Sequence, residues 1–363
     1  MKQIAIVGGG VVGAAIAYEL SCTAGMQVTL LEGATEFATQ STGAALGVLM
    51  GAISRKTKGR AWKLRQASLR RYQTLIPELE ALTGKAIAFN RQGILKLVRS
   101  TDDWAKWHDE FLGLRREQGW QLERWTPAEI ARRQPDLDLT GCLGGIYSPQ
   151  DGQVDPVELT QALIAGARLQ GADCRCGVRV LEIPRAEGGC CDRLITTAGE
   201  IRCDGAIVTA GLGSMALTGS DPSFQLQPVL GQARRVRLSR ELNVGFTPVV
   251  TADDVHLMPL GDREYWVGAT VEFGEAERAA VAAPEALATV WEGAISFCPA
   301  LAAAEIVREW WGLRPRPMGQ GAPVVKQLAG FTNVWLATGH YRNGVLLAPA
   351  TALVLGGISQ AMV

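Results

Sequence analysis

The chain has 363 residues, enough for about two domains at roughly 150 residues each. Apolar residues make up 47% and charged residues 20%, which is the composition of a water-soluble globular protein. The 36 basic residues balance 36 acidic ones, and this excludes a generally basic nucleic-acid-binding protein. We therefore expect no nucleic-acid partner.

Cysteine and histidine usage argues against a metal site. Eight cysteines are scattered without a Cys-x-x-Cys pair, and only three histidines are present. This spacing predicts free thiols in a reducing compartment and no bound metal. The apolar run 344–358 contains Pro349 and is shorter than the ~20 residues that span a bilayer. We therefore expect a cytoplasmic protein with no membrane span.

The first 32 residues match a dinucleotide-binding βαβ unit. The apolar run 4–7 predicts a buried strand, and the sequence Gly-Gly-Gly-Val-Val-Gly at 8–13 follows it and fits G-x-G-x-x-G. A helix is expected over 12–20, and a second strand over 27–31 ends at Glu32. Strand, helix, strand and terminal acid together make this signal much stronger than the glycines alone.

Each position of this motif has a physical role. Gly8 permits the tight turn, Gly10 lets the backbone approach a pyrophosphate, and Gly13 lets the helix pack on the strand. The helix amino terminus then faces the phosphates, and the Glu32 carboxylate can accept a hydrogen bond from a ribose hydroxyl. An acid at this place favours a free 2′-hydroxyl, so we expect FAD or NAD rather than NADP.

Later segments extend the same domain. Asp155-Pro156-Val157-Glu158 combines an N-cap, proline at the first helical position and an acid in the first turn. The elements expected from here on are a helix to about residue 170, strands at 178–183, 201–209 and 334–338, and an apolar helix from about residue 344. The fold class expected is α/β, with a Rossmann-like, discontinuous FAD-binding domain over 1–55, 145–215 and 325–363.

The intervening segments predict an α+β substrate-binding domain with an antiparallel sheet, over 56–144 and 216–324. Thr126-Pro127-Ala128-Glu129 forms a capping box that starts a short helix. A second helix follows Pro284. The strand-like runs of this domain are 226–238, 246–250, 256–259, 264–270 and 306–313.

Eight basic residues crowd the segment 55–71, and no acid lies between Glu36 and Glu78. We interpret the segment as the solvated face of a helix whose buried face carries Trp62, Leu69, Tyr72 and Ile76. A surface for phosphate, RNA or a partner protein is the alternative. The sequence leaves the role of this segment open.

Several fragments together resemble one family along the whole chain. Besides the glycine motif, the fragments are Pro228–Gln232, Gly268–Thr270, Trp311–Pro315 and Gly339–Pro349. They resemble the D-amino-acid-oxidase superfamily of FAD-dependent oxidoreductases, and most closely its glycine oxidases of thiamine biosynthesis. The carboxy-terminal fragment is the most specific, since many nucleotide-binding folds share the first one.

The resemblance implies an oxidase in which the flavin carries the chemistry and the protein positions the substrate. A small amine that bears a carboxylate would give its Cα hydride to flavin N5, the imine would be hydrolysed by water, and O2 would reoxidise the flavin to give H2O2. Arginine binds a carboxylate with a planar two-pronged donor. By resemblance Arg342 is the first choice for this clamp and Arg314 the second.

The resemblance also identifies residues along the cofactor. The amino terminus of the last helix would lie at the pyrimidine edge of the flavin and stabilise the anion of the reduced flavin. The residues assigned to FAD are Gly8, Gly10, Val11, Val12, Gly13, Glu32, Ser41, Thr42, Gly43, Ala44, Val178, Ala210, Gly211, Arg314, Gly339, His340, Tyr341, Arg342, Asn343, Gly344, Val345 and Leu346.

Departures from the family pattern bear on the substrate. Glycine oxidases have a tyrosine where this chain has His256, and that hydroxyl helps to hold the substrate carboxylate. By resemblance we therefore expect His256 in the substrate pocket, as a third catalytic residue beside Arg342 and Arg314; the alternative is an ordinary strand histidine. The residues Arg316–Gln320 replace the usual threonine and acid after Arg314-Pro315. Some relatives anchor the flavin through a cysteine near these arginines, and none stands there in this chain, so we expect non-covalent FAD.

These departures leave several alternatives open. One is an oxidase or dehydrogenase of the same fold acting on another small amine or imino acid, such as sarcosine, a D-amino acid or proline. A second, of another class, is an NAD-dependent dehydrogenase. The sequence also leaves open the electron acceptor and whether the chain forms a homo-oligomer.

Overall fold

The computed structural model describes residues 1–219, 224–274 and 281–361. One of its two large sheets is six-stranded and is built around the predicted βαβ unit, in the order β20-β21-β13-β1-β2-β9. All neighbours pair in parallel except β20, which is antiparallel to β21. Its strands are β1 (Lys2–Val7), β2 (Met26–Leu31), β9 (Asp173–Arg175), β13 (Gly205–Val208), β20 (Val324–Gln327) and β21 (Val334–Thr338).

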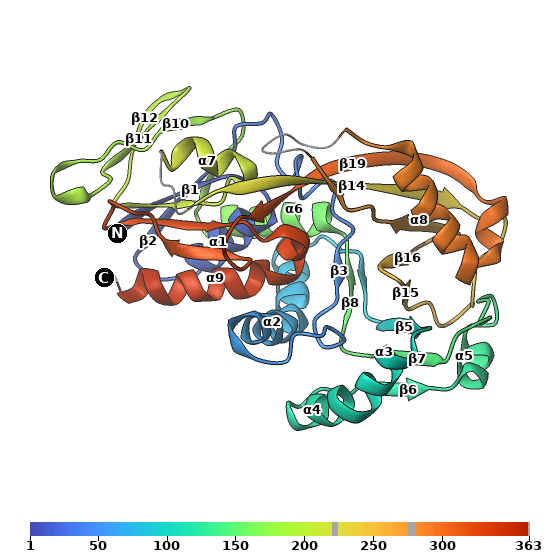
Figure 1. The fold of residues 1–363 in the computed structure, drawn as a ribbon. Coiled ribbons are helices and arrows are strands. Elements are labelled where there is room, and N and C mark those ends of the chain that lie inside the picture. The colour runs from blue at the N-terminus through green and yellow to red at the C-terminus, as the bar shows by residue number, and fades with distance from the viewer. Residues whose placement is uncertain (220–223, 275–280, 362–363) are drawn as a thin grey trace.

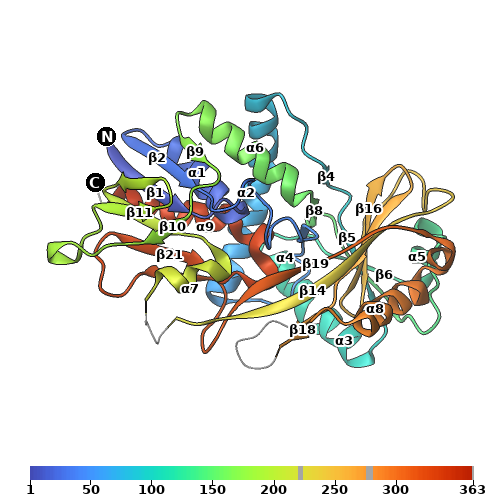
Figure 2. The same cartoon turned by 90° about the horizontal axis from the view of Figure 1, so that it is seen from above.

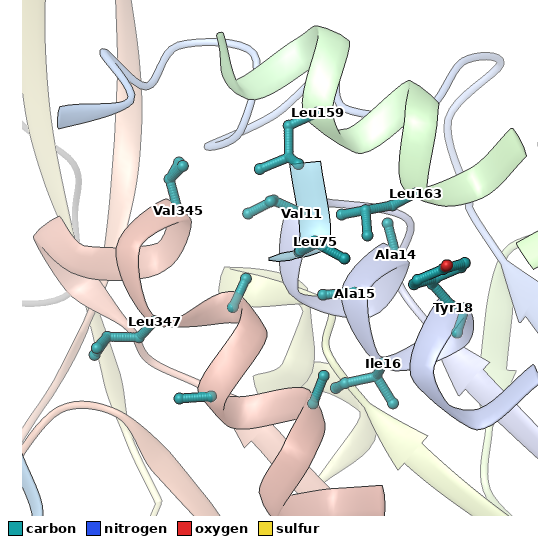
Figure 3. Close-up of a cluster of buried hydrophobic side chains, with 14 of the residues drawn as sticks. Val11, Ala14, Ala15, Ile16, Tyr18, Leu75, Leu159, Leu163, Val345 and Leu347 are labelled. Carbon is teal, nitrogen blue, oxygen red and sulfur yellow. The ribbon is translucent and has the colours of Figure 1, made fainter. Parts of the chain in front are cut away.

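Helices cover this sheet, and the first of them is buried on nearly all sides. Helix α1 (Val11–Ser21) contacts α6 (Pro156–Leu169) and α9 (Gly344–Ala361). Figure 3 shows side chains of α1, α6 and α9 gathered into one apolar cluster. Ala14, Ala15 and Ala17 let the helices approach closely, and all three are fully buried. The alanine-rich pattern of α1 is therefore a packing requirement.

The second large sheet is nine-stranded and mixed. Its longest strands, β14 (Leu226–Arg237) and β19 (Glu305–Pro317), pair antiparallel along the whole of β14 and run as a ribbon from the region of α7 towards α8 (Figures 1 and 2). The pairs are antiparallel except β5 with β15, which is parallel. The other strands are β5 (Ile94–Val98), β6 (Glu123–Trp125), β7 (Gly144–Ser148), β15 (Val249–Ala252), β16 (Val255–Gly261), β17 (Glu264–Gly268) and β18 (Glu272–Phe273).

Helices and small sheets complete the molecule. Both predicted caps are formed: Thr126 and Glu129 make the capping box of α5, and the Asp155 carboxylate caps α6. The remaining helices are α2 (Gly59–Thr83), α3 (Thr101–Lys106), α4 (Leu112–Glu117), α5 (Pro127–Arg133), α7 (Ser214–Leu217) and α8 (Pro284–Phe297). The small sheets consist of β3 (Val48–Leu49), β8 (Gly152–Val154) and β4 (Phe89–Asn90), and of β10 (Val180–Glu182), β11 (Arg193–Thr196) and β12 (Gly199–Arg202).

The strand predicted over 201–209 was wrong as a single element. It divides into β12, which pairs with β11, and β13, which joins the parallel sheet. The break falls at Asp204, whose backbone N–H donates to the Gln3 carbonyl at 2.7 Å while its carboxylate accepts from the Gln3 N–H. A run of apolar residues does not reveal that its two ends pair with strands of different sheets. The strand predicted at 178–183 is present as the shorter β10, whereas the one predicted at 246–250 is displaced to β15.

Residues 59–71 of the basic segment lie in α2, and the four apolar side chains predicted on the inner face of this helix are buried. The prediction of a solvated basic face was wrong for Arg65, which is 8% exposed. Its Nη2 donates to Asn343 Oδ1 at 3.2 Å. Arg71 is also engaged, in ion pairs with Glu19 and Glu78. Two of the basic residues therefore serve internal contacts.

All eight cysteines are free thiols. In the described ranges, none of the helices combines the length and apolar character needed to cross a membrane. Among the same residues, no three His, Cys, Asp or Glu side chains are grouped so that they could hold a metal ion.

Candidate active site

The predicted nucleotide-binding residues lie along one edge of the six-stranded sheet. Glu32, Gly8, Ala210 and Gly339 directly or closely follow the carboxyl ends of the adjacent strands β2, β1, β13 and β21. Open α/β sheets bind their ligands in the crevice outside this edge. Val178 joins the group, because its N–H donates to the Glu32 carbonyl at 2.9 Å.

The glycine motif has the close approaches that the sequence predicts. Gly8 has a φ of +111°, and a Cβ there would lie 2.8 Å from Ala210 Cα. A Cβ on Gly13 would lie 1.9 Å from the Gly8 carbonyl oxygen, so only glycine lets α1 pack on the turn. A Cβ on Gly10 would approach Thr42 Oγ1 at 3.0 Å and would meet no other atom of the described residues within 4 Å.

The start of α1 is suited to an anion. Its first turn carries no acidic residue, and the Val11 N–H donates to Thr42 Oγ1 at 3.0 Å. The Glu32 carboxylate accepts from the N–H groups of Gly9, at 2.7 Å, and Ala34, at 2.8 Å. Each carboxylate oxygen keeps a second lone pair for a ribose hydroxyl. The residues present therefore fit a bound dinucleotide.

The loop 41–44 joins this edge to the second sheet. Ser41 Oγ donates to the Leu313 carbonyl at 2.6 Å, and Trp310 Nε1 donates to the Ala44 carbonyl at 3.2 Å. A Cβ on Gly312 would lie 2.2 Å from the Ala44 Cβ. Sequence reasoning placed this loop along the cofactor and missed Trp310 and Gly312 as its packing partners. The close approach of Gly312 brings β19 against the loop.

The carboxy-terminal segment passes the same edge and enters α9. Gly339 has a φ of +64°, and the 3-10 turn Tyr341–Asn343 follows it. The His340 ring is buried, and its Nε2 lies 3.0 Å from Thr351 Oγ1. Burial, assisted by the charge of Arg60, lowers the pKa of His340 to about 3. Because this ring is packed into the core, His340 can reach a cofactor only through its backbone.

Two side chains of α2 hold the start of α9 in place. The Tyr72 hydroxyl donates to the Val345 carbonyl at 2.6 Å, and Arg65 donates to the Asn343 side chain. Val345 and Leu346 are themselves buried. Helix α9 begins at Gly344, as predicted, and hydrogen bonds from α2 hold the residues directly before and after this glycine.

Arg314 lies on β19 with its guanidinium held against β14. Its Nη1 donates to the carbonyls of Leu230, at 3.1 Å, and Thr270, at 3.0 Å. A Cβ on Gly231 would lie 2.1 Å from Nη2, so this glycine makes room for the guanidinium. Burial, followed by the nearby charge of Arg342, lowers the pKa of Arg314. The group is thus a rigid cation with donors left for an anion.

Arg342 is more exposed than Arg314, and its guanidinium forms an ion pair with a carboxylate. Its Nη1 lies 3.5 Å from Asp254 Oδ2, and the two side chains are 34% and 79% exposed. The sequence offered no signal for this contact, because the two residues are far apart along the chain. Asp254 is therefore a missed residue of the site.

His256 lies on β16 and completes the group. Its Nδ1 is buried and has no hydrogen-bond partner among the described residues. Burial is the main cause that lowers the pKa of His256 to about 4, and the charges of Arg342 and Arg314 lower it further, while Asp254 opposes them. The three predicted catalytic residues are therefore within electrostatic reach of one another. Two cations and a neutral imidazole form a site that favours a carboxylate.

Two buried charges that the sequence did not reveal hold the loop 51–56 ahead of α2. The Asp151 carboxylate accepts from the backbone N–H groups of this loop's first three residues at 2.8 Å. Arg115 donates to the carbonyls of Ala52, Ser54 and Lys56 and lies over the Trp62 ring. Neither residue stands in a recognisable motif, so only their spatial contacts identify them.

The fold and the site together define an α/β dinucleotide-binding oxidoreductase, in which a mostly parallel sheet carries the nucleotide edge and Arg314, Arg342 and His256 lie close together between this edge and the mixed sheet. The model of the FAD-dependent oxidoreductase family matches residues 3–357. The chain therefore belongs to the FAD-dependent oxidoreductase family, and its dinucleotide is FAD.

Comparison with individual proteins gives the same result. The chain is 30% identical over 350 residues to a glycine oxidase of Bacillus licheniformis, covering 95% of this chain and 89% of that protein. It is 31% identical over 364 residues to the bifunctional protein ThiO/ThiG of Synechocystis, covering 98% of this chain. The chain spans about half the length of that relative, since the match covers 51% of it. The family resemblance stated from the sequence is confirmed.

Solved structures show the same architecture. A glycine oxidase from Bacillus cereus superposes with a TM-score of 0.88 at 26% identity, covering 100% of this chain and 96% of the other. An L-proline dehydrogenase from P. horikoshii gives 0.86 at 19% identity, covering 99% and 93%, and it bears on the fold alone. The predicted fold class is confirmed.

Proposed function

We propose that this chain catalyses the FAD-dependent oxidative deamination of glycine or a similarly small amino acid. The observation that carries the proposal is the convergence of Arg314, Arg342 and His256 beside the nucleotide edge. Support comes from the alignment with a glycine oxidase over 95% of the chain.

The chain's own residues bind and orient the substrate. Arg314 offers the substrate carboxylate a guanidinium that two backbone carbonyls already hold in place. Arg342 supplies a second cation. The substrate carboxylate competes with the Asp254 carboxylate for the Arg342 guanidinium. His256 stays neutral at physiological pH because its pKa is about 4. A neutral imidazole still donates one hydrogen bond without repelling the two arginines.

The chemistry that FAD supplies when bound is acceptance of a hydride from the substrate Cα, after which water hydrolyses the released imine. A free substrate amine needs no side-chain base for this step, so the protein's task is positioning. The residues that would hold the cofactor are the glycine motif, Glu32, the loop 41–44, and the segment 339–346. We further propose that FAD is bound non-covalently, that O2 accepts the electrons to give H2O2, and that the protein is cytoplasmic.

The domain boundaries are part of the same proposal. We assign residues 1–55, 145–215 and 325–363 to FAD and residues 56–144 and 216–324 to the substrate. The arrangement of the six-stranded sheet supports the first group, because its strands come from these segments except β20, which begins at Val324.

The second candidate is oxidation of a larger small amine, such as sarcosine or D-alanine. The observation that favours it is His256, whose ring is shorter than the phenol that glycine oxidases carry at this place. A donor that sits further back leaves more room beside the carboxylate. Both candidates use the same arginines and the same cofactor.

A panel of small amino acids assayed for H2O2 tests the proposal. We expect turnover with glycine or sarcosine, and in Arg314→Ala substrate binding weakened by roughly 10-fold or more. Reduction of an artificial acceptor without H2O2 would identify a dehydrogenase. Failure of every small amino acid to reduce the bound flavin would contradict the proposed substrate class.

The cofactor proposal has a separate measurement. Acid precipitation of the yellow protein is expected to release the flavin into the supernatant. No cysteine follows Cys298, so the segment that contains Arg314 and Arg342 has no thiol to bond covalently to the flavin. Flavin that stays with the pellet would contradict non-covalent binding.

A further inference from the structure

Two buried thiols face each other at the end of the parallel sheet opposite the nucleotide edge. Cys191 Sγ and Cys203 Sγ lie 3.8 Å apart, and the residues are 1% and 5% exposed. Cys191 lies just before β11, which begins at Arg193, and Cys203 directly follows β12. No step of the proposed reaction uses either residue.

The backbone on both sides of this pair is held firmly. The Cys203 N–H donates to the Asp192 carbonyl at 3.0 Å, which extends the β11–β12 ladder by one pair. The Asn333 side chain accepts from the Cys191 N–H at 2.8 Å and donates to the Cys191 carbonyl at 2.7 Å. The backbone therefore holds the two sulfurs close together, and forming the bond would shorten their separation from 3.8 Å to about 2.05 Å.

The two thiols also differ in acidity. The hydrogen bond from Cys203 lowers the pKa of Cys191, against the opposing effect of burial. The same interaction and burial raise the pKa of Cys203. Cys191 is therefore the sulfur that ionises first, and the thiolate is the form that reacts with peroxides.

We propose that Cys191 and Cys203 are a redox-active dithiol that hydrogen peroxide oxidises to an intramolecular disulfide. The Cys191 thiolate attacks one peroxide oxygen, the O–O bond breaks, and a sulfenic acid and hydroxide form. The Cys203 sulfur then attacks the Cys191 sulfur, the S–O bond breaks, and the S–S bond forms. Two thiols lose two electrons and two protons, and one H2O2 becomes two waters.

Access to the pair is through the small sheet β10-β11-β12. Most residues of β12 are exposed, and the adjacent Cys190 is exposed as well. Edge sheets with few buried contacts open locally at low free-energy cost. A peroxide is about the size of water, so a brief opening admits it, whereas bulky thiol reagents reach the exposed Cys190 and Cys22 first.

The disulfide would close the loop 191–203 near the end of the parallel sheet where β13 and β21 begin. Cys203 lies just ahead of β13, and Cys191 is bonded to Asn333, which precedes β21. Closing a loop removes conformations from the unfolded chain. We therefore expect oxidation to raise the Tm by a few degrees.

Peptide mapping of the reduced holoenzyme after added H2O2 tests the proposal without substrate. Cleavage after arginine gives the peptides 186–193 and 203–234, and we expect them linked, two hydrogen masses lighter, and separated again by dithiothreitol. Peroxide is supplied from outside, so the result does not depend on the proposed function. Survival of both thiols, or separate over-oxidation without a link, would overturn the proposal.

Three serine variants identify the partners. Cys190→Ser, the matched neighbour, is expected to keep the link, whereas Cys191→Ser and Cys203→Ser lose it. In Cys203→Ser the Cys191 sulfenic acid lacks its partner, so dimedone should trap it once a denaturant added with the reagent exposes the buried sulfur. A link that needs Cys190, or no dimedone adduct in Cys203→Ser, contradicts the assignment.

The rise in Tm should be absent in Cys203→Ser, and an unchanged Tm in oxidised wild-type protein would refute the loop-closing effect.

Discussion

The two arginines of the site differ in how firmly each is held. Arg314 is half-buried and donates to two backbone carbonyls, whereas Arg342 is 34% exposed and paired with Asp254. A rigid donor loses less conformational entropy on binding than a mobile one. The resemblance ranks Arg342 first, but the geometry favours Arg314 as the main carboxylate ligand.

Replacing each arginine with alanine tests this ranking. A charged hydrogen bond contributes about 1.5–3 kcal/mol, so either variant should weaken substrate binding by roughly 10-fold or more, with the larger loss at Arg314. Arg342→Lys should recover only part, because a point charge does not replace the guanidinium fork. Steady-state kinetics and flavin-perturbation titration with a carboxylate inhibitor measure the loss. Wild-type constants in Arg342→Ala would remove it from the site.

His256 is the residue that bears most directly on substrate size. We expect His256→Tyr to raise the kcat/KM for glycine relative to sarcosine or D-alanine by about 10-fold, since a methylene in a pocket contributes roughly 1–3 kcal/mol. The phenol would extend further into the site and reduce the space beside the carboxylate. His108→Tyr, at an exposed histidine, is the control. An unchanged ratio in His256→Tyr would show that the residue does not contact substrate.

At the scale of elements, the packing of α1 against the turn after β1 requires glycine, which has no side chain, at position 13. A Cβ at Gly13 would lie 1.9 Å from the Gly8 carbonyl oxygen, which is backbone and cannot move aside cheaply. The turn 8–13 and the start of α1 therefore form only with glycine at this position.

Gly13→Ala should consequently weaken FAD binding by at least about 10-fold and lower the free energy of unfolding by about 1–3 kcal/mol. Gly356→Ala is the matched control, because its Cβ would meet nothing within 4 Å in α9. Alanine there should be neutral or stabilising by up to about 1 kcal/mol. Fluorescence titration of the apoprotein with FAD and urea unfolding give the two quantities. Normal FAD affinity in Gly13→Ala would contradict the packing argument.

For the whole molecule, buried histidines predict loss of stability in acid. Burial lowers the pKa of His340 to about 3, so the folded state keeps the ring neutral, whereas the unfolded chain protonates it below about 6.5. The unfolded state then binds more protons, and stability falls as the pH decreases from about 6.5 towards 3. His256 acts in the same direction, down to about pH 4.

At pH 4.5 this effect of His340 amounts to roughly 2–3 kcal/mol, since each pKa unit is about 1.4 kcal/mol. His340→Gln keeps a hydrogen-bonding side chain near Thr351 and removes the titration. Its free energy of unfolding should therefore change less between pH 7 and pH 4.5 than that of the wild type. Urea unfolding at both pH values is the measurement, with His108→Gln as control. Equal pH dependence in His340→Gln and wild type would contradict the prediction.

The sequence by itself determined the features that depend on residues close together in the chain. The capping box at Thr126 and the Asp155 cap are local, because a cap needs partners only a few residues away. The G-x-G-x-x-G turn and Glu32 belong to one βαβ unit, whose strand, helix and strand follow one another in the sequence. The resemblance added Arg314, Arg342 and His256 as residues, but not their geometry.

Only the tertiary structure decided the contacts between distant segments. It divided 201–209 between two sheets, buried Arg65 against Asn343, paired Asp254 with Arg342, and placed the Arg314 guanidinium over Gly231. Each of these depends on which strand edge or buried polar group meets which across a long sequence separation. Hydrophobic periodicity records burial and not the partner, and so the sequence alone could not reveal them.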